Sequence, residues 1–131
     1  MSGSAPLVSV LLTAYNREAY LAASIESVLA QSCGDFELII TDDRSSDGTL
    51  EIAREYERKD RRIHVHANER NLGDYGNRNF AASLASAEFL KFHDSDDVMY
   101  PHCLEVMIRY LSANHSTAFA LSAHRAWTGA A

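Results

Sequence analysis

Short apolar runs alternate with amphipathic helical segments along this chain, and this alternation restricts its possible folds more than any other feature. Strands are expected at residues 8–13, 36–41, 62–67 and 88–93, with a fifth at residues 117–122. Helices are expected at residues 18–31, 50–58 and 77–86, and again from Pro101 onward. The first run is β-branched and almost continuously apolar, which is typical of a parallel strand covered on both faces. The order predicts an α/β domain with a mainly parallel sheet and helices on both faces.

The composition and charge narrow the class of protein. A length of 131 residues suits one domain, and 47% hydrophobic with 23% charged residues is ordinary for a globular protein. The net charge of −6 disfavours a nucleic-acid or anionic-membrane partner, because such partners need basic patches. An acidic protein that binds a phosphorylated ligand must neutralise it locally, with bound cations, helix N-termini or a few arginines.

The ends of the chain and its cysteines bear on domain organisation and compartment. Residues 1–6 are expected to be a flexible leader before one domain at residues 7–131. No export signal is recognisable, and no apolar run reaches the ~20 residues of a membrane-spanning helix. We expect a cytoplasmic chain without a membrane segment, and leave open a membrane association of the full-length protein. Cys33 and Cys103 lack metal or redox spacing and are expected to be buried thiols.

Polar side chains follow the expected strands where each one ends. They are Thr13, Tyr15 and Asn16 after the first strand, Asp42 and Asp43 after the second, and Asp94, Asp96 and Asp97 after the fourth. In open parallel sheets, ligands bind beyond the carboxyl ends of the strands, where the strand order reverses. The sequence therefore predicts a ligand site at this edge, provided that the fold brings the first and fourth strands together.

The acidic cluster, Asp94, Asp96 and Asp97, has two interpretations. Like charges at about 4 Å repel by about 1 kcal/mol per pair even in water, so a cation between them would relieve a real cost. Mg²⁺ and similar hard cations are often held by one or two carboxylates together with phosphate oxygens. The alternative is an acidic turn in which Asp97 serves the start of the helix after Pro101. A short acidic motif alone favours the turn, whereas its place after a buried strand favours the cation.

The other candidates also have two interpretations each. Asp43, with its neighbour Asp42, either caps the following helix or accepts a hydrogen bond from a nucleobase imide or a ribose hydroxyl. Tyr15 either stacks on a base or packs against the sheet edge. Arg70 and Arg78 are the cations best placed to meet phosphates, although a solvent-exposed arginine is the slightly favoured alternative for each.

Several ordered motifs resemble those of one family. They are the segments at residues 8–16, 26–32 and 36–40, the run at residues 42–49 (Asp-Asp-Arg-Ser-Ser-Asp-Gly-Thr), and the segments at residues 68–73 and 94–97. Together they resemble family 2 glycosyltransferases, which are inverting enzymes with the Rossmann-like GT-A fold. The resemblance runs over residues 7–122, and the order of the motifs makes it far more specific than any one of them.

The resemblance implies a nucleotide-diphospho-sugar donor, usually a UDP-sugar, and a divalent cation, Mn²⁺ or Mg²⁺. Thr13, Tyr15 and Asp43 match positions that hold the nucleoside, and with Arg78 and Asp94 they form the expected nucleotide-binding set. Asp94 and Asp96 match the family's DxD motif, with Asp96 as the direct metal ligand. Such enzymes serve cell-wall or polysaccharide biosynthesis, and the acceptor stays open among saccharide, lipid and protein.

The sequence departs from the family pattern in three places. Residues 74–77 replace the small residues usual before Arg78, which implies a narrower pocket beside the phosphates or a different donor. His93 stands before the DxD motif, where an apolar residue is more common. Family members normally continue well past this length into an acceptor-binding half that carries the catalytic base. No residue here matches that base, so we expect it beyond Ala131 and expect this chain to be the N-terminal, donor-binding portion.

Other classes of function fit less well. A noncatalytic nucleotide-sugar-binding module remains the main alternative. A receiver-like signalling domain would need a lysine at the end of its last strand, and the only lysines are Lys59 and Lys91. A dinucleotide-binding oxidoreductase is disfavoured because no GxGxxG motif follows the first strand.

Overall fold

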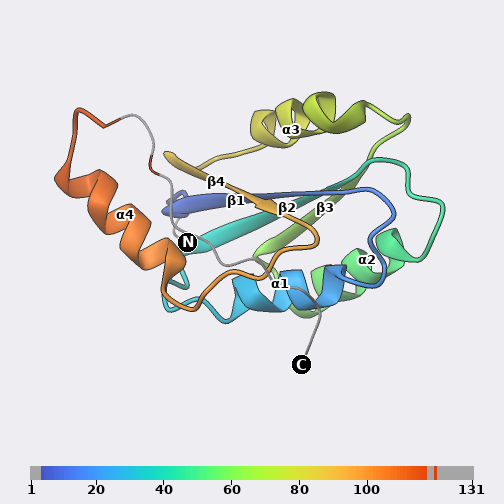
Figure 1. The fold of residues 1–131 in the computed structure, drawn as a ribbon, viewed down its shortest axis with the longest axis horizontal. Coiled ribbons are helices and arrows are strands. Elements are labelled where there is room, and N and C mark those ends of the chain that lie inside the picture. Colours follow the sequence, from blue (N-terminus) through green and yellow to red (C-terminus); the bar gives the residue numbers. More distant parts are fainter. Residues whose placement is uncertain (1–3, 118–119, 121–131) are drawn as a thin grey trace.

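The computed structural model of the chain describes residues 4–117 and residue 120 (Figure 1). Its elements, in order, are β1 (Val8–Ala14), α1 (Leu21–Leu29), β2 (Phe36–Asp42), α2 (Thr49–Lys59), β3 (Ile63–Ala67), α3 (Gly73–Ser83), β4 (Phe89–Asp94) and α4 (Cys103–Ala113). The predicted alternation of strands and helices is thereby confirmed over these residues. The predicted fifth strand at residues 117–122 falls largely outside the described residues.

The four strands form one parallel sheet in the order β3-β2-β1-β4. β1 pairs with β2 on one side and β4 on the other, so that Thr13 lies between Thr41 and Asp94. The chain winds outward from β1 through β2 to β3, and then crosses back to place β4 on the far side of β1. The strand order therefore reverses between β1 and β4, and it is beyond their carboxyl ends that a ligand is expected.

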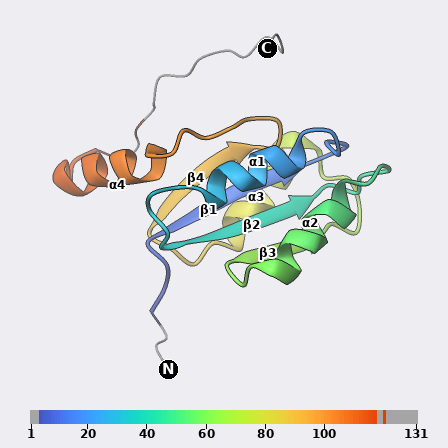
Figure 2. The same ribbon diagram turned by 90° about the horizontal axis from the view of Figure 1, so that it is seen from below.

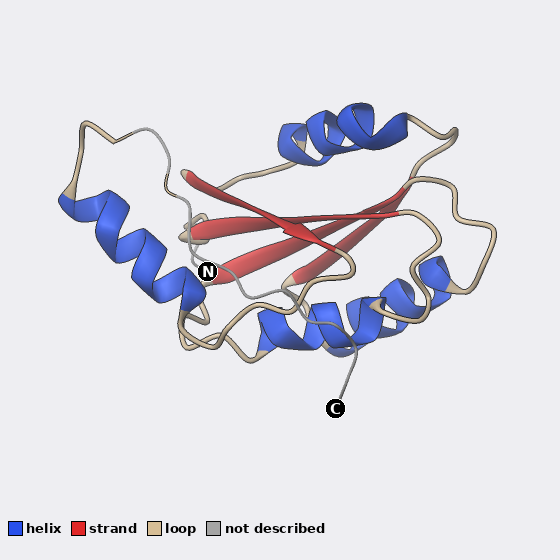
Figure 3. Ribbon diagram, in the orientation of Figure 1, coloured by secondary structure: helices blue, strands red, loops and turns tan. Residues whose placement is uncertain are grey.

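Helices cover both faces of the sheet, as predicted: α3 lies on one face, and α1 and α2 lie on the other (Figure 3). The view from below shows α1 and α2 side by side across the strands, with α4 set apart from them (Figure 2). Along β1, Val8, Val10 and Leu12 face the main core, which also includes Leu104 of α4. The alternate residue Leu11 packs beneath α3, where Ile39 and Ala81 complete a smaller cluster. This alternation is the two-residue period of a strand buried on both faces.

All four helices begin at residues other than those predicted. α2 begins one residue early, at Thr49, and α4 begins at Cys103, so that Pro101 lies in the turn before the helix instead of opening it. α3 starts at Gly73 and ends at Ser83, whereas residues 77–86 were expected, because the polar turn before it leads directly into the helix. α1 starts at Leu21 instead of residue 18, since the carbonyl of Arg17 accepts hydrogen bonds from the backbone N–H groups of Tyr20 and Leu21 and forms a separate turn.

Two further expectations concern the cysteines and the membrane. Cys33 and Cys103 are free thiols, and both are half-buried instead of fully buried. No helix in the described part of the chain is long and apolar enough to cross a membrane.

Candidate functional site

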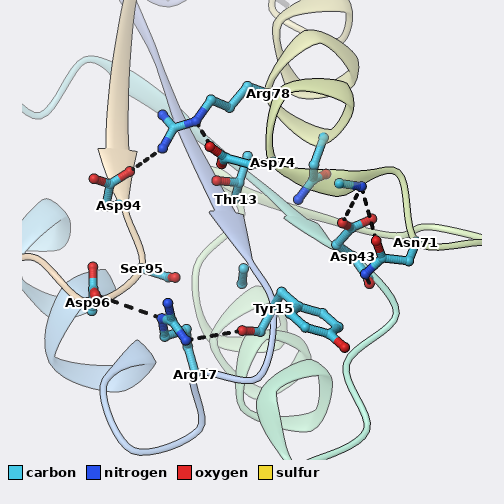
Figure 4. Close-up of a pocket in the computed structure, with 13 residues that line it drawn as sticks. Thr13, Tyr15, Arg17, Asp43, Asn71, Asp74, Arg78, Asp94, Ser95 and Asp96 are labelled. Carbon is cyan, nitrogen blue, oxygen red and sulfur yellow. Dashed lines mark hydrogen bonds and ion pairs between the residues drawn. The ribbon is translucent and has the colours of Figure 1, made fainter.

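An open cavity of about 450 Å³ lies beyond the carboxyl ends of the strands. It is lined by Thr13, Ala14, Tyr15 and Arg17 after β1, by Asp43 after β2, by Asn71, Gly73, Asp74, Asn77 and Arg78 at the start of α3, and by Asp94, Ser95 and Asp96 after β4. Its volume is in the usual range for small-molecule sites. Figure 4 shows that the side chains of the lining residues come from four separate segments of the chain and converge on one cavity.

The predicted site residues all line this cavity: Thr13, Tyr15, Asp43, Arg78, Asp94 and Asp96. Arg70 does not line it and is exposed in the loop before α3. Arg17 and Asn71 also line the cavity and were not predicted, whereas Asp74 belongs to residues 74–77, which were expected to narrow the pocket. Asp74 stands four residues before Arg78, so the two side chains lie on the same side of α3. The rule that ligands bind beyond the carboxyl ends of parallel strands thus located the cavity, while the roles of the lining residues remain predictions.

The acidic cluster has the oxygen donors that a hard cation prefers. Asp94, Asp96 and Asp97 each offer one carboxylate oxygen, and these oxygens all lie within 4.8 Å of one another. The side chains of Asp94 and Asp96 are each 49% exposed, so they face solvent across the cavity. α4 begins only at Cys103, with no side-chain hydrogen bond at its cap. The backbone N–H of Asp97 donates to the carbonyl of Asp94 at 3.1 Å, so the cluster also forms a turn, and the cation and the acidic-turn interpretations both stay as predictions.

Two arginines face the acidic cluster (Figure 4). Arg78 lies between two carboxylates: its Nε donates to Asp74 at 3.0 Å and an Nη donates to Asp94 at 2.8 Å. Burial lowers the pKa of Arg78, but the hydrogen bonds that it donates to Asp94 and Asp74 outweigh burial and raise the pKa above its usual value. Arg17 faces Asp96, with 3.8 Å between its Nε and the carboxylate. The cavity thus has alternating charges, in which carboxylates outnumber arginines.

Asp43 caps a helix, as one of its two predicted interpretations has it, while its role as an acceptor for a nucleobase or ribose stays a prediction. It is only 3% exposed, and its Oδ1 accepts from the Asn68 side chain at 3.1 Å and from Leu72 N–H at 2.7 Å. Its Oδ2 accepts from Gly73 N–H at 3.0 Å. Asp43 therefore caps the start of α3, whereas the helix that directly follows it in sequence is α2. Each carboxylate oxygen accepts about two hydrogen bonds, so Oδ2 keeps one acceptor position, and Asp43 lines the cavity.

The rest of the 42–49 motif holds the loop that follows β1. The Arg17 N–H donates to Thr49 Oγ1 at 2.8 Å, and the Asn16 N–H donates to Ser45 Oγ at 2.9 Å. Asn16 has a φ of 52°, in the left-handed region that asparagine tolerates better than most residues. Asp47 accepts from the N–H and hydroxyl of Thr49 and fixes its side chain. The motif thereby sets the position from which Tyr15 and Arg17 reach the cavity.

His93 supports the strand end from the other side of the sheet. Its Nε2 lies 2.9 Å from Ser24 Oγ, and that hydroxyl donates to the backbone carbonyl of Asp94 at 3.0 Å. Ser24 has a single hydrogen, so His93 must donate from Nε2. Burial lowers the pKa of His93 to about 4, and the ring is therefore neutral at pH 7. The unusual histidine before the acidic cluster anchors Asp94 to α1.

Comparisons with known proteins agree on one family. The model described as Glycosyl transferase family 2 matches residues 9–126. The chain is 39% identical over 124 residues to the putative teichuronic acid biosynthesis glycosyltransferase TuaG of Bacillus subtilis, covering 95% of this chain and 49% of TuaG. It is 40% identical over 109 residues to the UDP-Glc:alpha-D-GlcNAc-diphosphoundecaprenol beta-1,3-glucosyltransferase WfgD of Escherichia coli, covering 83% of this chain and 42% of WfgD.

Solved structures show the same fold. S. aureus TarS 1-349 in complex with UDP-GlcNAc matches with a TM-score of 0.77 and 32% identity over 83% of this chain and 32% of TarS. The mannosyltransferase PcManGT from Pyrobaculum calidifontis, in complex with GDP-Man and Mn²⁺, matches with a TM-score of 0.74 over 84% of this chain and 33% of that one. At 20% identity, the second likeness concerns the fold alone. The chain spans less than half the length of each of these four proteins.

Proposed function

The chain belongs to glycosyl transferase family 2, and on that premise we propose that it forms the donor-binding part of an enzyme that transfers a sugar from a nucleotide-diphospho-sugar, with inversion and with a divalent cation. The observation that carries the proposal is the convergence of Asp43, Asp94, Asp96 and Arg78 on one cavity where the strand order reverses. Family membership removes the receiver-like alternative.

The proposed donor is a UDP-sugar, and Asp43 is the main support for the choice of base. One acceptor position of its carboxylate remains after three hydrogen bonds from Asn68, Leu72 and Gly73. Uracil offers a single imide N–H to such an acceptor, whereas the corresponding edge of guanine offers two donor groups and would leave one unpaired. An unpaired buried donor costs about 1–3 kcal/mol. Tyr15, half exposed on the same cavity, would stack on the base, and Thr13 lines the cavity as well.

The proposed cation is Mn²⁺ or Mg²⁺, held by Asp94 and Asp96. Around the cavity, the carboxylates of Asp74, Asp94 and Asp96 outnumber the guanidinium groups of Arg17 and Arg78, so a diphosphate alone would meet net negative charge. A bound cation would supply Lewis-acid stabilisation of the negative charge that builds on the departing nucleoside diphosphate. Arg78 and the His93–Ser24 pair would keep Asp94 in position for it.

The general base of the reaction is proposed to lie outside residues 4–117. Each described carboxylate that lines the cavity already has a partner: Asp43 accepts three hydrogen bonds, Asp74 and Asp94 bind Arg78, and Asp96 faces Arg17. We therefore expect none of them to take the proton of an acceptor hydroxyl. For the same reason, a noncatalytic donor-binding module is the second candidate function. Sugar transfer by the full-length protein would identify an enzyme, and donor binding without transfer would identify the module.

A thermal-shift panel tests the proposal. UDP, TDP and GDP are each added with Mn²⁺ to the wild-type protein, to Asp96→Ala and to Asp35→Ala. Asp35 is exposed at the opposite end of the sheet, before β2, and its replacement is a matched control for the loss of one carboxylate. We expect UDP to give the largest stabilisation in the wild type and the control, and none in Asp96→Ala. Equal shifts for GDP and UDP would refute the role given to Asp43, and no metal-dependent shift with any nucleotide would refute the proposal.

A further inference from the structure

The two arginines that line the cavity differ in how firmly their ion pairs hold them. Arg78 makes two hydrogen-bonded ion pairs, at 3.0 Å to Asp74 and 2.8 Å to Asp94, and its side chain is 32% exposed. Arg17 makes one ion pair, at 3.8 Å to Asp96, and its side chain is 44% exposed. Arg78 is therefore fixed between two carboxylates, whereas Arg17 has a single, longer ion pair.

Arg17 has a fixed backbone and a loosely held guanidinium group. Its N–H donates to the buried hydroxyl of Thr49 at 2.8 Å. Within the described residues, the guanidinium group has two other polar contacts, at 3.4 Å to the carbonyl of Tyr15 and at 3.3 Å to the carbonyl of Asn16. Both are near the long limit of a hydrogen bond, so little energy opposes a rotation of the side chain. The anchored backbone holds the start of the Arg17 side chain beside the cavity.

A divalent cation on Asp96 and the guanidinium group of Arg17 compete for the same carboxylate. Like charges a few ångströms apart repel, and a cation of charge +2 repels the guanidinium group about twice as strongly as a single charge would. A diphosphate brings the opposite charge, and a planar guanidinium group binds its oxygens well. Arg17 can therefore leave Asp96 at least cost when cation and diphosphate are both present.

We propose that Arg17 is an exchange residue, which pairs with Asp96 before the donor binds and transfers to the diphosphate once a cation occupies Asp96. This proposal rests on the proposed function of the same site. It makes the cation and the nucleotide bind cooperatively, because the nucleotide provides the new partner for the arginine that the cation displaces. By linkage, each ligand raises the affinity of the other by the same factor.

Arg78 serves as the contrast to this behaviour. Asp74, which stands where the family usually has a small residue, holds Arg78 on its other side. Arg78 therefore remains beside Asp94 and acts as a positioning residue, while Arg17 supplies the mobile positive charge.

Binding of Mn²⁺ alone tests the proposal, followed by UDP and by uridine in saturating Mn²⁺. Calorimetry and Mn²⁺ electron paramagnetic resonance are applied to the wild type, Arg17→Gln, Arg17→Lys and Arg109→Gln. Arg109 on α4 is exposed and pairs with Glu105 at 2.6 Å, so its replacement controls for the loss of one positive charge. In Arg17→Gln we expect Mn²⁺ alone to bind about 5-fold more tightly, as the loss of a half-exposed competing charge implies. UDP should bind about 10-fold more weakly, because one charge-assisted hydrogen bond is missing.

Uridine and the two control variants separate an exchange of Arg17 from a general loss of positive charge. Uridine, which lacks phosphates, should bind the wild type and Arg17→Gln alike, and Arg17→Lys should keep the wild-type affinity for Mn²⁺. Unchanged or weaker Mn²⁺ binding in Arg17→Gln, or the same gain in Arg109→Gln, would overturn the exchange. A wild type that binds Mn²⁺ but no UDP would instead refute the proposed function, while the comparison of Mn²⁺ affinities would still report on Arg17 and Asp96.

Discussion

Asp43→Asn is the substitution whose effect follows most directly from the geometry. The asparagine keeps one acceptor oxygen, which can still serve Asn68 and Leu72, but its NH₂ group then faces the N–H of Gly73. Two donors meet in a site that is only 3% exposed. The loss of one hydrogen bond to a charged acceptor costs about 1.5–3 kcal/mol. The loss of the negative charge at the start of α3 costs about 0.5–1 kcal/mol more.

We therefore expect Asp43→Asn to lower the free energy of unfolding by about 2–4 kcal/mol. For a domain of this size, that corresponds to a fall in melting temperature of about 10 °C. The assay is urea unfolding followed by circular dichroism, with thermal unfolding as a second reading. Asp35→Asn is the matched control, and its effect should stay within about 0.5 kcal/mol because Asp35 is exposed.

A stability of Asp43→Asn within about 0.5 kcal/mol of the wild type would refute the reasoning. In that case the carboxylate would not be the cap of α3, and its three hydrogen bonds would not constrain its orientation toward the cavity. The choice of uracil over guanine would then lose its main support.

Three further predictions address the surroundings of the site. Burial lowers the pKa of His93 from 6.5 to about 4. Between pH 6.5 and pH 4 the folded protein therefore binds fewer protons than the unfolded chain. The free energy of unfolding should fall by up to about 3 kcal/mol as the pH drops through this range. His93→Gln should remove this part of the pH dependence, and an unchanged unfolding profile would contradict it. Thr49→Val should lower the free energy of unfolding by about 1–2 kcal/mol, because the N–H of Arg17 loses its acceptor, and should also weaken UDP binding. Unchanged stability in urea would count against the proposal that the 42–49 motif holds the loop after β1. Asp96→Ala should abolish metal-dependent UDP binding while leaving stability within about 0.5 kcal/mol, because its side chain is half exposed, and retained UDP affinity in calorimetry would oppose its role as a metal ligand.

The sheet and the main site residues were predictable from local patterns. Apolar runs identified each described strand, and the parallel order placed the side chains after β1, β2 and β4 at one edge. Thr13, Tyr15, Asp43, Asp94 and Asp96 follow from that rule, because the end of a strand can be recognised without knowing its neighbours.

The unpredicted features depend on contacts between segments that are distant in sequence. The donors that hold Asp43 are mostly backbone N–H groups, at Leu72 and Gly73, and any residue except proline supplies such a group. Arg17 reaches Asp96 only because β4 lies beside β1, which no local pattern states. The start of α3 was placed too late for the same reason, since a carboxylate from another loop stabilises it.

Calorimetry can show whether this chain binds UDP through a divalent cation on Asp94 and Asp96. UDP is titrated into the folded wild-type protein with Mn²⁺, with Mg²⁺, and with a chelator in place of either cation. We expect binding of one nucleotide per chain in the presence of either cation, and its loss in the chelator. Equal UDP affinity with and without a divalent cation, or no binding under any of these conditions, would contradict it.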